Sequence, residues 1–441
     1  MSRNLKIAAA VVVAMGAGSA ANALVPSASV DLRLYVAGAS AQRDTFQQEI
    51  TNICQSGTQH NYRASPTAGQ DFRAYSCTLL NAAPVPTALR NKNVVVYYRS
   101  EGGSIYGVGS LAKNLSLQEL VVNTTVCPGN PAGTYAVAPA FNDCAVSGFN
   151  LDADTATSGL VKHRVDLGVS DVEPTRFVGE NWNSTPFLGA QPTAAQLSAI
   201  TAQTATGTVF GVAVNTALTS VTDLSTQDLT SIFSGTYGDW SQLANANNTA
   251  GAGGEIKVCR REVGSGTQVS MSIYANNQGC NAGAYPFVQE PSTPIFGNPV
   301  QHVTTTGAMG SCIAGHPGAI GFLTYTATPP TGTKWVTLNG KTPGKVAAAL
   351  GDYDFWFEST FNTDEYITSS QPADDAGGLR DDLAAYLVSR ARTAATIPVN
   401  DSAFALYNSG TNFPVIPVDT TRPIGIATRG GNSCARAQGT F

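Results

Sequence analysis

Short runs of β-branched and aromatic residues alternate along this chain with stretches in which apolar residues recur every three or four positions. The runs at 93–98 (NVVVYY) and 209–214 (VFGVAV) are typical of buried strands. Strands that alternate with helices in this way predict an α/β fold. The chain shows no internal repeat.

The same pattern predicts the ends of two helices. Ser225 and Asp228 have the spacing of a capping box, and Gly235 is placed to end the helix that they start. A second helix is predicted before Arg390 and Arg392, whose charges complement its C-terminal dipole. Its apolar face is formed by Leu379, Leu383, Tyr386 and Leu387.

Residues 104–165 lack such periodicity and contain two cysteines with several prolines and glycines. The segment predicts a surface insertion pinned by one disulfide. It would be either a stabilised loop or a lid that covers a ligand.

The N-terminus predicts export. Arg3 and Lys6 precede an apolar run at 7–18, and a small-x-small site follows at 21–23, so we expect residues 1–23 to be a signal peptide. The apolar run is shorter than the roughly 20 residues that span a bilayer. No cysteine follows the predicted cleavage site, so we expect no lipid anchor. The mature protein is therefore expected in the periplasm or outside the cell.

The amino-acid composition argues against one class of binding partner, nucleic acid. The formal net charge is −5, and the predicted mature chain is more acidic still because the leader is basic. An acidic chain without basic runs does not favour nucleic acid, since that binding depends on clustered Lys and Arg. Charged residues make up 12% of the chain, about half the usual share, as expected of a loop-rich exported protein.

The eight cysteines predict disulfides rather than a metal or redox site. None forms a CxxC pair and the chain has only four histidines. An even number of cysteines in an oxidising compartment favours disulfides. Proximity in sequence suggests the pairs Cys54–Cys77, Cys127–Cys144 and Cys259–Cys280, which leaves Cys312–Cys434.

A strand at 256–261 that runs into Gly264-Ser265-Gly266-Thr267 and then a helical pattern predicts an anion site. Glycines let the backbone approach a ligand closely, and a helix N-terminus offers free N–H groups and partial positive charge. Arg261 adds a planar fork that suits an oxyanion. An ordinary capped helix would show the same short run.

Six segments in register resemble the periplasmic phosphate-binding proteins of phosphate ABC importers, which have the type II periplasmic-binding-protein fold. The resemblance implies two lobes with a ligand cleft between them and two hinge crossings, near 205–212 and 350–358. The segments are Ala37–Ser40, Arg99–Gly103, Asp166–Asp171, Leu224–Trp240, Arg260–Thr267 and His316–Phe322.

On this resemblance the first lobe comprises residues 24–207 and 352–441, with the insertion at 104–165, and the second lobe comprises 208–351. Aromatic residues at 353–361 would then form the return crossing and part of the first lobe's core.

The resemblance also implies a set of ligand residues. Asp171 would accept the proton that phosphate still carries, which a fully ionised sulfate lacks. A turn residue ahead of Glu173 is the simpler alternative for Asp171. Hydroxyls of the first lobe would bind through Ser40 and Ser100, and the second lobe would bind through Arg261, Ser265, Gly266 and Thr267.

One position departs from the family pattern. The family usually places an acid two residues after the ligand arginine, where the two side chains pair, but this chain has Val263 there. Glu262 is adjacent and would point to the opposite face if the strand continued. Arg261 is therefore expected to lack a carboxylate partner, which leaves phosphate and other oxyanions both open as ligands.

We expect a monomeric, exported solute-binding protein that captures inorganic phosphate, or a similar tetrahedral oxyanion, for an ABC importer, without cofactor or metal. One alternative is an exported structural, matrix or phosphate-scavenging protein that keeps the fold but not transport. A secreted phosphatase is less favoured, because no GxSxG, HExxH or metal-binding cluster of His and carboxylates occurs. We do not expect an enzyme.

Overall fold

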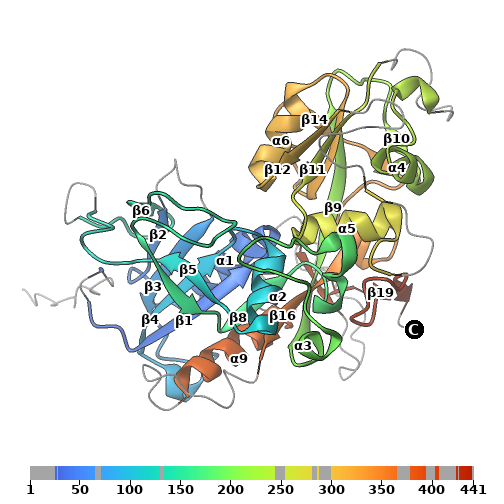
Figure 1. Ribbon diagram of the computed structural model, residues 1–441. Coiled ribbons are helices and arrows are strands. Elements are labelled where there is room, and N and C mark those ends of the chain that lie inside the picture. The colour runs from blue at the N-terminus through green and yellow to red at the C-terminus, as the bar shows by residue number, and fades with distance from the viewer. Residues whose placement is uncertain are drawn as a thin grey trace, which may run out of the picture.

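The computed structural model shows two α/β lobes that share one long strand (Figure 1). The predicted signal peptide lies outside the residues that it describes. Those residues are 25–26, 28–64, 71–129, 134–243, 254–280, 286–287, 299–364, 378–393, 403–406, 424–425 and 427–439.

The shared strand is β9, whose 15 residues run from Thr201 to Asn215. Its first half pairs with β16 (Trp356–Thr363) in one lobe, and its second half pairs with β13 (Ala319–Thr324) in the other. A second crossing leads from α7 (Lys345–Ala349) back into β16. The α/β class and the two-lobed architecture that the sequence predicted are thus present. We keep 207/208 and 351/352 as proposed lobe boundaries.

In the first lobe the sheet continues in the order β9-β16-β8-β1-β4-β3-β2-β6, in which β1 is parallel to both β4 and β8. Its further elements are β1 (Leu32–Gly38), α1 (Arg43–Ile53), β2 (His60–Ala64), β3 (Phe72–Thr78), β4 (Asn93–Arg99), α2 (Ser104–Lys113), β6 (Phe141–Cys144), β8 (Leu167–Ser170), α3 (Ala194–Ser198) and α9 (Leu379–Ala391).

Helices cover both faces of this sheet, which is why its central strands are buried along their whole length. Leu34 and Val36 of β1 pack in one core cluster with α1 and α9, through residues such as Ile50 and Leu387. On the opposite face α2 contacts β1 and β8. The helix that the sequence predicted around Leu379 is therefore a core helix of the first lobe.

The second lobe has the sheet order β12-β11-β13-β9. The capping box at Ser225 and Asp228 forms as predicted and starts α4. The lobe's elements are β10 (Asp223–Leu224), α4 (Thr226–Phe233), β11 (Lys257–Arg261), α5 (Gly266–Asn276), β12 (Val300–Val303), α6 (Thr306–Gly315), β14 (Thr333–Trp335) and β15 (Thr337–Leu338).

Short elements complete the described parts of the chain. Besides 3-10 turns these are β5 (Ser116–Leu120), β7 (Leu160–Arg164), β17 (Ala403–Leu406), β18 (Ile424–Gly425), β19 (Ala427–Thr428) and β20 (Gln438–Gly439). None of the described helices is long and apolar enough to cross a membrane.

The predicted insertion has a more defined structure than its sequence suggested. Its first ten residues form α2, and the rest contains the antiparallel pair β5–β7 and the strand β6, which pairs with β2. A fully buried ion pair holds it, since Arg99 Nη1 lies 2.6 Å from Asp154 Oδ1 and neither side chain is exposed. Asp154 Oδ2 also accepts from the backbone N–H of Gln118.

Two of the four predicted disulfides are correct and two are wrong. Cys54–Cys77 and Cys127–Cys144 form as expected. The others are Cys259–Cys312, which joins β11 to the helix α6 that packs on it, and Cys280–Cys434, which spans 154 residues. Proximity in sequence failed there because the partners are brought together by packing between elements that are distant in the chain.

The buried ion pair yields a stability prediction. Asp154→Ala leaves the Arg99 guanidinium buried without its carboxylate, so we expect a loss of about 3–5 kcal/mol in the free energy of unfolding. The matched control is Asp143→Ala, which breaks the exposed 2.6 Å pair with Arg63 and should cost less than about 1 kcal/mol. Chemical denaturation measures both, and equal losses would contradict the account.

Candidate anion-binding site

Three loops of the first lobe meet at one edge of its sheet. Parallel β1, β4 and β8 end there, and each is followed within two residues by a predicted ligand residue, respectively Ser40, Ser100 and Asp171. Ligands of open α/β sheets bind at this carboxyl edge. Gly38 permits the crowding, because its φ is +139° and a Cβ there would lie 1.8 Å from the carbonyl oxygen of Val169.

The second lobe presents the end of β11 and the start of α5 to those loops. β11 ends at Arg261, Ser265 is the N-cap of α5, and Gly266 and Thr267 begin the helix. The first turn of a helix leaves its N–H groups without partners inside the helix, so α5 directs donors and partial positive charge towards the first lobe.

The two lobes touch at this place. The backbone N–H of Ile105 donates to the carbonyl oxygen of Gly264 over 3.0 Å. A Cβ on Gly266 would lie 2.2 Å from Ser104 Oγ and 2.7 Å from Asp171 Oδ2, so no larger residue fits between helix α5 and the Asp171 carboxylate.

Most of the predicted residues come together across this junction. Thr267 Oγ1 donates to Asp171 Oδ2 over 3.2 Å, and Arg261 Nη1 lies 3.5 Å from Ser40 Oγ. Ser265 packs against Gly103, where a Cβ would lie 3.2 Å from Ser265 Cα. Ser100 is engaged differently, because its hydroxyl donates to Asp71 Oδ1 over 2.9 Å.

Arg261 Nε and Asp171 Oδ1 at the junction are buried and have no hydrogen-bond partner, and the same is true of Gln268 Oε1 in the first turn of α5. Arg261 and Asp171 are each 1% exposed. The remaining guanidinium nitrogens are engaged, since Nη2 donates to the carbonyl oxygen of Thr304 over 2.6 Å. Arg261 and Asp171 thus leave one donor and one acceptor unsatisfied, and each carries a desolvation cost of about 1–3 kcal/mol or more.

Burial sets the protonation of the Asp171 carboxyl. It raises the pKa of Asp171 to about 6, against the opposing effects of the Thr267 hydroxyl, the Arg261 charge and the Gln42 amide. Asp171 is therefore mainly ionised at neutral pH and can accept a second hydrogen bond at Oδ1.

The position of Glu262 differs from the prediction that its side chain points away from Arg261. β11 ends at Arg261, so the alternation of a strand does not extend to Glu262, and its Oε1 lies 3.7 Å from Arg261 Nη2. Arg261 therefore has a carboxylate neighbour despite Val263. Burial raises the pKa of Glu262 to about 8, opposed by the charge of Arg261 and helped by those of Glu101 and Asp71.

Sequence reasoning missed the acidic residues around Arg261. Burial, with repulsion from Asp71, raises the pKa of Glu101 to about 7. Glu101 lies inside the RSEGG segment, so its position was available from the resemblance. Asp71 gave no signal, because it precedes β3 and reaches the site only through the fold. The described residues contain no group of three His, Cys, Asp or Glu that could hold a metal ion.

A scan against protein-family models matches residues 189–377 to a model described as the PBP superfamily domain. This segment contains Arg261, Ser265, Gly266 and Thr267, whereas Ser40, Ser100 and Asp171 precede it. A search of curated proteins found no match.

Among solved structures, the chain is similar to an ABC-type phosphate transport receptor from Vibrio cholerae, with 13% identity and a TM-score of 0.39 over 81% of this chain and 97% of that one. It is also similar to a phosphate binding protein from Stenotrophomonas maltophilia, with 14% identity and a TM-score of 0.37 over 82% and 90%. At these values, the ligand has to be inferred from this chain's own residues.

The pKa of Glu262 predicts how stability depends on pH. Its value in the folded protein, about 8, lies above the ordinary value of 4.5, so the unfolded chain releases this proton first. The free energy of unfolding should therefore fall as pH rises from about 4.5 to 8. Glu262→Gln should remove that contribution, which would make the ligand-free variant more stable than the wild type at pH 8 but not at pH 4.

Chemical denaturation at several pH values measures this difference. The exposed Glu255 is the control, because Glu255→Gln removes one carboxylate of the same lobe and should shift stability by less than about 0.5 kcal/mol at each pH. Parallel pH profiles for Glu262→Gln and the wild type would contradict the prediction.

Proposed function

We propose that this protein is a solute-binding protein that captures inorganic phosphate, or a closely similar protonated tetrahedral oxyanion, at the junction of its two lobes. One observation carries the proposal: the buried donor Arg261 Nε and the buried acceptor Asp171 Oδ1 both lack partners. A protonated oxyanion offers an acceptor oxygen to the first and an O–H donor to the second.

The other groups at the junction fit the same ligand. Hydroxyls of Ser40 and Ser265, the N–H groups that begin α5 at Gly266 and Thr267, and the Arg261 guanidinium are all donors to an anion. Hydrogen bonds to charged groups contribute about 1.5–3 kcal/mol each. Micromolar affinity corresponds to about 8 kcal/mol, so a few such bonds suffice even after the costs of binding.

Asp171 gives the proposed site its selectivity. Asp171 is 1% exposed, and its ionised carboxylate repels an anion that has no proton to donate. Sulfate at neutral pH is such an anion. The same carboxylate binds a protonated phosphate oxygen. Phosphate is therefore accepted and sulfate rejected while Asp171 is ionised.

We further propose that the protein acts outside the cytoplasm, after removal of residues 1–23, and that its closed form is recognised by an ABC permease. Closure of two lobes around a ligand is the usual device of such proteins, because it converts occupancy into a shape that a membrane partner can distinguish. A binding role, rather than catalysis, is the proposal for this chain.

Asp171→Asn tests the selectivity. The amide cannot repel a fully ionised anion, so the ratio of phosphate to sulfate affinity should fall by at least tenfold at pH 7.5. In the wild type the same ratio should decrease below pH 6, where Asp171 becomes protonated. Isothermal titration calorimetry on protein stripped of bound anion measures both ratios. A variant that keeps the wild-type preference would remove Asp171 from the site.

Arg261→Ala tests the guanidinium. Loss of its charge-assisted bonds should weaken phosphate binding by roughly 100-fold or more in the same titration. The matched control is Arg260→Lys on the preceding residue of β11, whose guanidinium lies 4.6 Å from the Phe287 ring centroid. The control should bind phosphate within about threefold of the wild type, and equal losses in both variants would refute the assignment.

A further inference from the structure

A third covalent connection joins the two lobes. The chain crosses between them in β9 and again between α7 and β16, and the Cys280–Cys434 disulfide adds a link outside the backbone. Cys280 follows α5 of the second lobe by four residues. Cys434 belongs to the C-terminal segment, residues 427–439, which Figure 1 shows beside the junction at β19.

The C-terminal segment is fixed to the β16 crossing by the buried residue Arg429. Its guanidinium donates to the carbonyl oxygens of Asp354 and Trp356 over 2.8 and 3.0 Å. In return, the Glu358 carboxylate accepts from the backbone N–H groups of Arg429 and Gly431, each over 2.6 Å. The segment therefore moves with the first lobe's end of the crossing.

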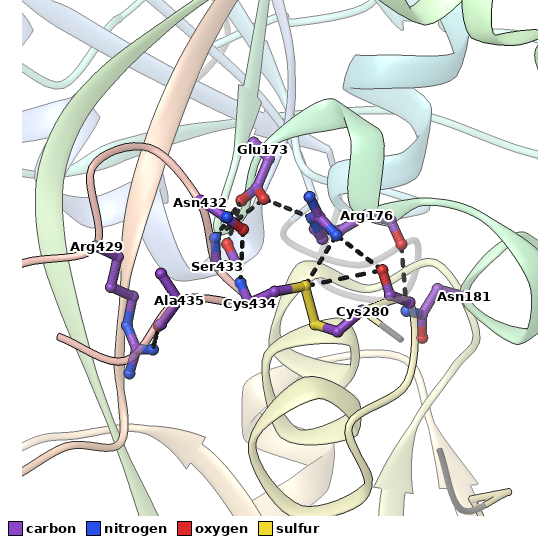
Figure 2. Close-up of a disulfide and its surroundings, with 10 residues drawn as sticks. Glu173, Arg176, Asn181, Cys280, Arg429, Asn432, Ser433, Cys434 and Ala435 are labelled. Carbon is purple, nitrogen blue, oxygen red and sulfur yellow. Dashed lines mark hydrogen bonds and ion pairs between the residues drawn. A yellow bond between two sulfur atoms is a disulfide. The ribbon is translucent and has the colours of Figure 1, made fainter. Parts of the chain in front are cut away.

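A second anchor lies directly beside the disulfide (Figure 2). The Glu173 carboxylate of the first lobe accepts from the backbone N–H of Ser433 over 3.0 Å and binds the Arg176 guanidinium. Arg176 Nη1 also donates to Cys434 Sγ and to the carbonyl oxygen of Gly279, each over 2.8 Å. One first-lobe arginine thus contacts both ends of the bridge.

The bridge and the candidate site lie at opposite ends of one helix. The first turn of α5 contacts Asp171 through Thr267, and the residues after its C-terminus reach Cys434. A helix of 11 residues is about 16 Å long. When the lobes separate, α5 has to move away from the first lobe as a rigid element, and the disulfide prevents that movement at its far end.

We propose that the Cys280–Cys434 disulfide restrains opening of the lobes, so that the bound anion exchanges slowly while the bridge is intact and rapidly once it is reduced. The part about the anion rests on the proposed function, whereas the restraint on opening does not. With the bridge intact, the site retains its ligand. A thiol reductant would break the S–S bond to give two cysteine thiols, would itself be oxidised to a disulfide, and would so allow the lobes to open and release the ligand.

The test compares two disulfide-free variants. Cys280→Ser with Cys434→Ser removes the bridge between the lobes, and the control, Cys127→Ser with Cys144→Ser, removes a bridge within the first lobe. The probes are radiolabelled inorganic phosphate, chased with unlabelled phosphate, and small-angle X-ray scattering of the anion-free proteins.

The bridge variant should release phosphate at least tenfold faster than the wild type, and its anion-free form should have a larger radius of gyration. The control should match the wild type in both. If the serine variant does not fold, Cys280→Ala with Cys434→Ala and brief reduction of folded wild type are the second routes. An unchanged radius of gyration and release rate in a folded variant would overturn the proposal.

The two proposals fail separately. If no variant binds phosphate, the proposed ligand is wrong, yet scattering of the anion-free proteins still decides whether the bridge restrains the lobes. If phosphate binds and scattering is the same in both variants, the function stands and the restraint is refuted.

Discussion

Where the two lobes meet, two buried side chains have complementary hydrogen-bonding groups that are left without partners. Asp171 from the first lobe needs a further donor, and Arg261 from the second needs a further acceptor, while both side chains are excluded from water. Unmet hydrogen-bonding capacity at such depth is costly to the folded protein. On the proposed function, a ligand that carries both an acceptor and a proton would satisfy the two at once and so couple lobe closure to occupancy.

The rest of the fold positions this pair. Three parallel strands end at the edge where Ser40, Ser100 and Asp171 lie, and β9 carries the chain to the second lobe without an intervening loop. β9 pairs with β16 on the first lobe's side and with β13 on the second lobe's side, so one strand is part of both sheets. Burial raises the pKa of Glu101 to about 7 and that of Glu262 to about 8, so these groups become charged as the pH rises through neutrality and the field at Arg261 depends on pH.

Local features were predictable from the sequence where one short segment contains all the interacting groups. The capping box of α4 is an example, because Ser225 and Asp228 contact each other three residues apart. Glu262 was misplaced, since strand alternation could not reveal that β11 ends one residue earlier. The Cys280–Cys434 pair, the Arg99–Asp154 pair and the place of Asp71 depend on contacts between distant segments, which no local pattern encodes.

A crystal structure of the wild-type protein grown with inorganic phosphate would locate the bound anion. We expect a tetrahedral anion within hydrogen-bond distance of both Arg261 Nε and Asp171 Oδ1, with further bonds from the first turn of α5. Phosphate bound elsewhere, or an Arg261 and an Asp171 that keep these two atoms unpaired in saturating phosphate, would contradict this expectation.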